Sequence, residues 1–148
     1  MNLAKYIDHT ILKATATKED VAKLCDEAAR HGFASVCVNP FWVSLCSDLL
    51  KGSGVKVCTV IGFPLGANES AVKAFEANLA IKQGAEEVDM VINIGALKSG
   101  MYDVVRNDIS AVREASEGKV LKVIIETSYL TDAEKETVCK ICTECGVD

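Results

Sequence analysis

The hydrophobic and polar positions of this chain follow two alternating patterns, short apolar runs and longer amphipathic stretches. In residues 17–32 the apolar side chains recur at helical spacing, and Thr17 and Asp20 are spaced as a capping box. The next run, FASVCVNP, is rich in β-formers, and Asn39 and Pro40 at its end can begin another helix. The pattern therefore predicts a strand followed by a helix.

The same order recurs three more times along the chain. Apolar runs begin near residues 55, 86 and 120, and each is followed by an amphipathic stretch. The last stretch again opens with a capping-box pair, Thr131 and Glu134. Four strand–helix units of this kind predict an α/β fold in which parallel strands are joined by right-handed crossovers.

Four such units are half of an eight-stranded TIM barrel, which takes about 250 residues. Gly146 ends the last helix, and Val147 and Asp148 begin what reads as a further strand. We therefore expect a single partial TIM-barrel domain over residues 1–148. It would be a half-barrel with parallel strands and an N-terminal helix, truncated at the start of the fifth strand.

Composition and charge favour a globular protein and argue against nucleic-acid binding and membrane insertion. The chain has 148 residues, of which 49% are hydrophobic and 25% charged, so it can bury a globular core. A net charge of −5 and scattered Lys and Arg argue against a nucleic-acid partner. No apolar run approaches a membrane span, and the start lacks a signal peptide's apolar region, so we expect a cytoplasmic protein. Its seven cysteines are then expected to be reduced thiols.

A carboxylate and an amine interrupt two of the apolar runs. Asp89 lies in VDMVINI and Lys122 in LKVII, and each is flanked by residues that a buried strand would contain. Because a barrel can gather such side chains on its inward face, Asp89 and Lys122 could pair across adjacent strands as a proton carrier and its cationic partner. A purely structural ion pair would leave the same pattern.

Two cysteine features have competing interpretations. Cys37 lies near the end of a strand, where α/β folds bind their ligands, but a buried cysteine is also an ordinary core residue. The spacing of Cys139, Cys142 and Cys145 is typical of iron–sulfur ligands. They lie within a capped amphipathic helix and no fourth cysteine follows, which favours a structural role over a metal or redox module.

Several motifs together resemble the deoxyribose-phosphate aldolases. These motifs cover nearly the whole chain: IDHTILK at 7–13, SVCVNP at 35–40, TVIGFPLG at 59–66, EVDMVINIGALKSG at 87–100 and LKVIIET at 121–127. The resemblance implies a TIM barrel and a class I aldolase, active in deoxyribonucleotide catabolism. Such an enzyme cleaves 2-deoxy-D-ribose 5-phosphate to glyceraldehyde 3-phosphate and acetaldehyde through a lysine Schiff base, with no metal or other cofactor.

The resemblance also assigns roles to individual residues. Asp89 matches the family's proton donor and acceptor, and Lys122 matches its buried lysine; both are expected to be catalytic. Asp8 and Thr10 match the polar pair of the opening motif, and Cys37 matches the active-site cysteine; these three are expected to bind substrate.

Several parts of the family's active site have no counterpart in the sequence: the Schiff-base lysine, a second active-site lysine and the phosphate-binding loops of the last strands. The resemblance places the Schiff-base lysine just after residues that match Gly146 to Asp148. Three expectations stay open: an aldolase in which Lys122 reacts weakly with aldehydes, an inactive half-barrel that needs a C-terminal half, and a homo-oligomer formed through exposed strand edges.

Overall fold

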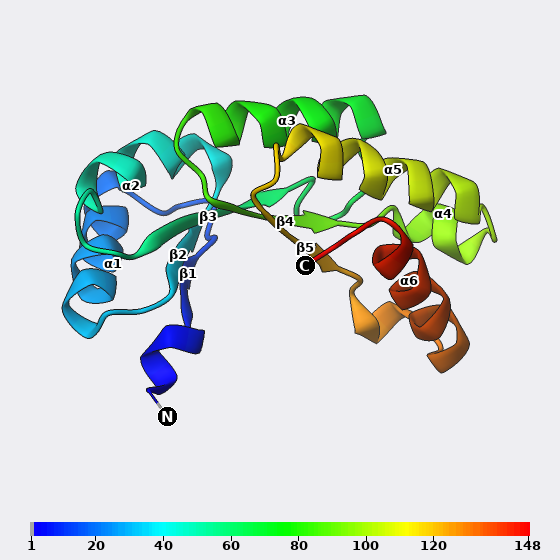
Figure 1. Ribbon diagram of the computed structural model, residues 1–148, viewed down its shortest axis with the longest axis horizontal. Coiled ribbons are helices and arrows are strands. Elements are labelled where there is room, and N and C mark those ends of the chain that lie inside the picture. The colour runs from blue at the N-terminus through cyan, green and yellow to red at the C-terminus, as the bar shows by residue number, and fades with distance from the viewer. Residues whose placement is uncertain (1) are drawn as a thin grey trace. The chain divides into compact units, whose positions relative to one another are not determined.

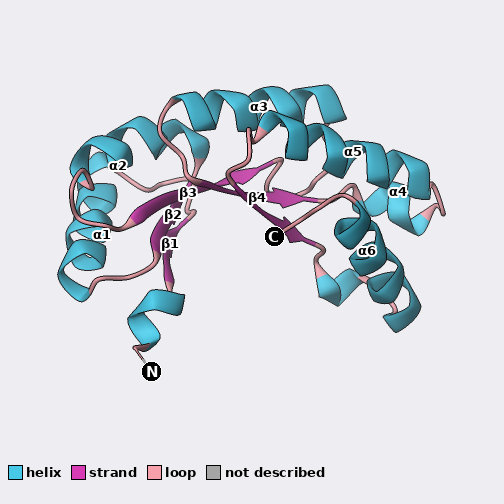
Figure 2. Cartoon of the chain, in the orientation of Figure 1, coloured by secondary structure: helices cyan, strands magenta, loops and turns pink. Residues whose placement is uncertain are grey.

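Strands and helices alternate through residues 2–148, the part of the chain that the computed structural model describes (Figures 1 and 2). The strands are β1 (Asp8–Ile11), β2 (Ser35–Val38), β3 (Lys56–Ile61), β4 (Glu87–Val91) and β5 (Val120–Ile124). The α-helices are α1 (Lys18–His31), α2 (Val43–Leu49), α3 (Ser70–Lys82), α4 (Ile94–Lys98), α5 (Tyr102–Ala115) and α6 (Asp132–Glu144). Three 3-10 helices complete the list: η1 (Leu3–Tyr6), η2 (Pro40–Trp42) and η3 (Thr127–Tyr129).

The predicted α/β fold class is confirmed, with one strand more than the sequence pattern indicated. All four predicted strands are present as β2 to β5, and each is followed by helix. The additional strand is β1, whose sequence DHTI has only four residues and no apolar run. Its formation depends on parallel pairing with β2, which local sequence does not reveal. The expected N-terminal helix is the single 3-10 turn η1.

The described residues divide into two compact units. Unit 1 consists of residues up to Val60 together with Ala80–Glu87. Unit 2 consists of Ile61–Leu79 and Val88–Asp148. Whether the chain forms one structural domain, as the sequence suggests, stays a prediction.

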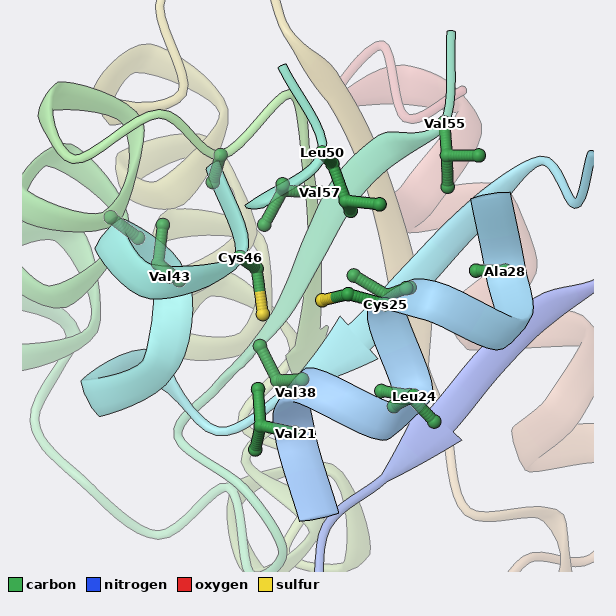
Figure 3. Packing of buried hydrophobic residues seen from close by; sticks show 13 residues of the cluster. Val21, Leu24, Cys25, Ala28, Val38, Val43, Cys46, Leu50, Val55 and Val57 are labelled. Atoms are coloured by element: carbon green, nitrogen blue, oxygen red, sulfur yellow. The ribbon is translucent and has the colours of Figure 1, made fainter. Parts of the chain in front are cut away.

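Unit 1 contains three parallel strands in the order β1, β2, β3. Successive side chains of a strand point to opposite faces, so Val36 and Val38 of β2 lie on one face and Ser35 and Cys37 on the other. The valine face packs against α1 and α2 in an apolar core (Figure 3). This core contains Val21, Leu24, Cys25, Ala28, Val36, Val38, Val43, Cys46, Leu50, Val55, Val57, Ala80 and Ala85.

Unit 2 contains the neighbouring strands β4 and β5, with α4, α5, α6 and most of α3. Apolar side chains of both strands are fully buried, among them Val88, Met90 and Leu121. The backbone of Asp148 also lies along β5, because its N–H donates to the carbonyl of Leu121 at 3.1 Å. The Asp148 carboxylate accepts from the N–H of Leu121 and from Arg113, and these hydrogen bonds lower its pKa.

The helix ends show how local sequence positions the elements. Both predicted capping boxes are confirmed, Thr17 with Asp20 at α1 and Thr131 with Glu134 at α6. Asn39 occupies the expected N-cap position of η2 but makes no capping hydrogen bond. Its side-chain amide instead donates to the carbonyl of Leu12 at 3.3 Å, so it ties the end of β2 to the segment after β1.

None of the helices in residues 2–148 combines the length and the apolar composition that a membrane crossing requires.

Candidate functional site

In unit 1, the predicted substrate-binding residues share the face of the sheet opposite the helices. Thr10 of β1 lies in register with Cys37 of β2, and Asp8 lies in register with Ser35. The Ser35 hydroxyl donates to the Asp8 carboxylate at 2.7 Å, which holds this acid at the start of β1. Asp8 and Thr10 are exposed on the edge strand, so both are accessible to a ligand.

The same face continues onto β3 with a further ion pair. Lys56 lies in register with Ser35, and its ammonium is 2.9 Å from the Glu87 carboxylate. Hydrogen bonding to this carboxylate raises the pKa of Lys56. Unit 1 thus presents alternating hydroxyl, carboxylate and ammonium groups at the beginning of its strands.

Cys37 has a different environment from its exposed neighbours. Its side chain is buried and packs with Cys58 and Val60 in a small apolar cluster, against which Leu12 also packs. Burial in an apolar cluster is what the core interpretation of this cysteine predicts. Its role as a substrate contact stays a prediction, which its position beside Thr10 supports.

In unit 2, the two predicted catalytic residues form the expected pair. Lys122 Nζ lies 3.2 Å from Asp89 Oδ1, a distance at which the ammonium and the carboxylate form an ion pair. The Asp89 side chain retains 17% of its accessible surface and that of Lys122 retains 35%. The pairing predicted from strand alternation is therefore confirmed, and both side chains keep part of their accessible surface, although Asp89 Oδ1 itself is buried.

Contacts within the protein fix the conformation of the GFPLG turn at 62–66. The Gly62 N–H donates to the Glu76 carboxylate of α3 at 2.8 Å. Gly66 has a φ of +64°, and a Cβ at this position would lie 1.9 Å from the carbonyl oxygen of Ile92. The need for glycine at 66 is therefore explained by close contact with the backbone after β4, without any contact to a ligand.

Sequence reasoning missed a second ion pair, which lies deep in unit 2. Lys73 of α3 has no exposed surface, and its Nζ lies 2.6 Å from Asp108 Oδ2 on α5. The same ammonium donates to the carbonyl of Val91 at 2.9 Å, at the end of β4. The buried pair therefore links two helices, which lie side by side in Figure 1, to the strand that carries Asp89.

The three clustered cysteines do not gather as metal ligands. Cys139 and Cys142 lie on α6 and Cys145 caps its end. Among residues 2–148, their sulfur atoms do not form a group compact enough to hold one metal ion. Burial, together with the neighbouring thiols, raises the pKa of Cys142 to about 11, which disfavours the thiolate that metals bind. The structural interpretation of this cluster is therefore favoured.

Comparison with known proteins shows the family of this chain. The family model described as "DeoC/LacD family aldolase" matches residues 2–145. The chain belongs to this aldolase family. Among its relatives, the deoxyribose-phosphate aldolase of Geobacillus sp. (strain WCH70) is 60% identical over 99% of this chain and 66% of the relative. The deoxyribose-phosphate aldolase of Finegoldia magna is 59% identical over 100% of this chain and 70% of the relative.

Solved structures of aldolases share the fold. The protein "QR15, an Aldolase" matches with a TM-score of 0.94 and 40% identity, over 99% of this chain and 65% of that one. The tetrameric deoxyribose phosphate aldolase of Aeropyrum pernix matches with a TM-score of 0.91 and 34% identity, over 99% of this chain and 62% of that one. The half-barrel fold class is thereby confirmed, and the chain spans about two thirds of its aldolase relatives.

Proposed function

We propose that this chain acts on 2-deoxy-D-ribose 5-phosphate and on the acetaldehyde that its cleavage releases, as an aldehyde-lyase. Asp89 carries protons and Lys122 is the amine beside it, while Asp8, Thr10 and Cys37 contact substrate. The observation that carries the proposal is the 3.2 Å pair of Lys122 and Asp89. Relatives about 60% identical over the whole chain, which are named deoxyribose-phosphate aldolase, support the choice of substrate.

The pair can support Schiff-base chemistry in a defined order. The neutral amine of Lys122 adds to the aldehyde carbon and gives a carbinolamine. Protonated Asp89 then donates a proton to the hydroxyl group of the carbinolamine. Water leaves, and an iminium forms. The iminium draws electrons from the neighbouring carbon, and the Asp89 carboxylate can accept the proton that this carbon releases.

Borohydride trapping with acetaldehyde tests the proposal directly. Reduction of the iminium leaves one ethyl group on the reacting lysine, which intact mass and peptide mapping locate. We expect one adduct per chain at Lys122 and none there in Lys122→Met. Asp89→Asn should slow adduct formation by about tenfold or more, because proton transfer to the carbinolamine is lost. Lys135→Met, which alters a partly exposed lysine of α6, is the matched control.

The opposite result would assign a different function. If Lys122 gains no ethyl group beyond the level of other lysines, the chain alone has no Schiff-base activity. The alternative is a non-catalytic half-barrel that requires a complementary C-terminal half. The backbone hydrogen bond from Asp148 to the carbonyl of Leu121 supports this alternative, because β5 there accepts a hydrogen bond from the segment after α6.

The remaining parts of the proposal concern location and partners. We infer a cytoplasmic protein, which the seven free cysteines support because thiols stay reduced there. We also infer a homo-oligomer that associates through strand edges. A small phosphorylated sugar or aldehyde is the expected ligand, while nucleic acid and membrane are not expected as partners.

A further inference from the structure

Two cysteines face each other inside the core of unit 1. Cys25 lies on α1 and Cys46 on α2, and Figure 3 shows their sulfur atoms pointing toward one another. The Cys25 side chain is only 2% exposed and that of Cys46 is fully buried. The side chains labelled around them in Figure 3 are aliphatic, among them Val21, Leu24 and Val38. The two thiols are thus each other's polar partner in an apolar setting.

Each thiol affects the pKa of the other. The Cys46 thiol donates to the sulfur of Cys25, which lowers the pKa of Cys25 because its thiolate is stabilised. The same hydrogen bond and burial raise the pKa of Cys46. Whichever of the two thiols loses its proton, the resulting thiolate can accept a hydrogen bond from the other thiol, which favours its formation.

We infer that Cys25 and Cys46 are an oxidative modification site at which a peroxide joins α1 to α2 by a disulfide. The Cys25 thiolate attacks one oxygen of hydrogen peroxide, the O–O bond breaks, and hydroxide leaves. Cys46 then attacks the sulfenic sulfur of Cys25, its thiol proton is released, and the sulfenic oxygen leaves as water. Two thiols and one peroxide thus give one disulfide and two water molecules.

The position of the pair suits this modification. The two sulfur atoms point toward one another between α1 and α2, which pack together in one core (Figure 3), so a disulfide would join elements that are already neighbours. Burial makes the reaction slow, because peroxide reaches the two sulfur atoms only when the surrounding structure opens locally. Neither cysteine has a role in the proposed aldolase chemistry, so the inference does not depend on that function.

Peroxide treatment followed by thiol mapping tests the inference. The exposed and half-buried cysteines of α6 and its C-cap are first removed as Cys139→Ser, Cys142→Ser and Cys145→Ser, which leaves four of the seven thiols. After oxidation, the protein is denatured and alkylated without reductant. We expect the count of alkylated thiols to fall from four to two, with a linked peptide pair containing Cys25 and Cys46. Dithiothreitol should restore all four.

Single variants supply the control. Cys25→Ser and Cys46→Ser should each abolish the linked peptides, whereas Cys58→Ser should keep them. Because the parent protein is itself mapped, the inference stays testable even if one variant does not fold. Linkage of Cys37 to Cys58 with Cys25 and Cys46 still alkylated would overturn it. Conversion of Cys25 to a sulfinic acid without any linkage would overturn it as well.

Discussion

At the scale of single residues, the buried ion pair of Lys73 and Asp108 is where we expect a single substitution to destabilise the fold strongly. An ionised group in the interior is tolerated only when it is paired, and the Lys73 ammonium donates both to Asp108 Oδ2 and to the carbonyl of Val91. Lys73→Met should therefore lower the free energy of unfolding by about 3–5 kcal/mol, because it leaves the Asp108 carboxylate buried without its cation. Urea unfolding monitored by circular dichroism measures the change.

Two further variants make this prediction specific. Lys135→Met breaks an ion pair between α6 side chains in which Asp132 is 95% exposed, and should cost less than about 1 kcal/mol. Combining Lys73→Met with Asp108→Leu removes both charges and should recover most of the lost stability. If Lys73→Met were no more damaging than Lys135→Met, the buried pair would contribute no more than an exposed one.

Strand alternation makes some site residues predictable and leaves others hidden. Asp89 and Lys122 could be paired from sequence because each interrupts an apolar run on a definite face of its strand. Lys73 could not, because a lysine in a helix ordinarily extends into solvent. Its burial depends on Asp108, which is 35 residues away in the chain. The steric need for Gly66 depends equally on distant backbone, the carbonyl of Ile92.

At the scale of elements, local signals were sufficient where a helix or a strand carries its own pattern. The capping boxes predicted where α1 and α6 begin, and the apolar runs predicted β2 to β5. The pattern failed for β1, whose four residues alternate between exposed and half-buried positions. It also failed for the five-residue helix α4, which Asn93 caps by accepting from the N–H of Ala96.

The capping box of α1 gives a pH-dependent prediction. Hydrogen bonds from the Thr17 backbone N–H and hydroxyl lower the pKa of Asp20 in the folded protein. A lowered pKa means that this stabilisation is present above the unfolded value of about 4 and is lost as pH falls through the folded value. Asp20→Asn should therefore lower the melting temperature at neutral pH, and its difference from the parent should shrink in acid.

Thermal unfolding between about pH 7 and about pH 2 checks this expectation. Asp48→Asn, at an exposed position of α2, controls for the loss of one negative charge. A difference between Asp20→Asn and the parent that stays constant down to the lowest pH would show that the carboxylate form of Asp20 contributes nothing to α1.

At the scale of the whole molecule, the edge strand β1 predicts self-association. An edge strand presents free backbone groups, and Leu3, Tyr6 and Ile7 beside β1 are exposed apolar side chains. We expect light scattering to give a mass at least twice the 15.8 kDa of one chain at micromolar concentration. Ile7→Lys should reduce this mass to that of a monomer, because a charge at the edge opposes strand pairing.

A matched variant distinguishes association through the β1 edge from association through any exposed apolar side chain. Leu49→Lys introduces the same charge at an exposed apolar position of α2 in the same unit, and should leave the mass unchanged. A mass of 15.8 kDa for the parent at every concentration would contradict association through the edge.

Because Lys73 is completely buried, its chemical reactivity reports how often unit 2 opens locally. Among residues 2–148 it is the one lysine in the buried core, whereas Lys122 is about one third exposed. An acylating reagent reaches Lys73 only while α3 and α5 are apart, so its rate of acylation counts those openings. The acylation rate of this one amine would thus give the rate of local opening of the unit that holds Asp89, without any added label.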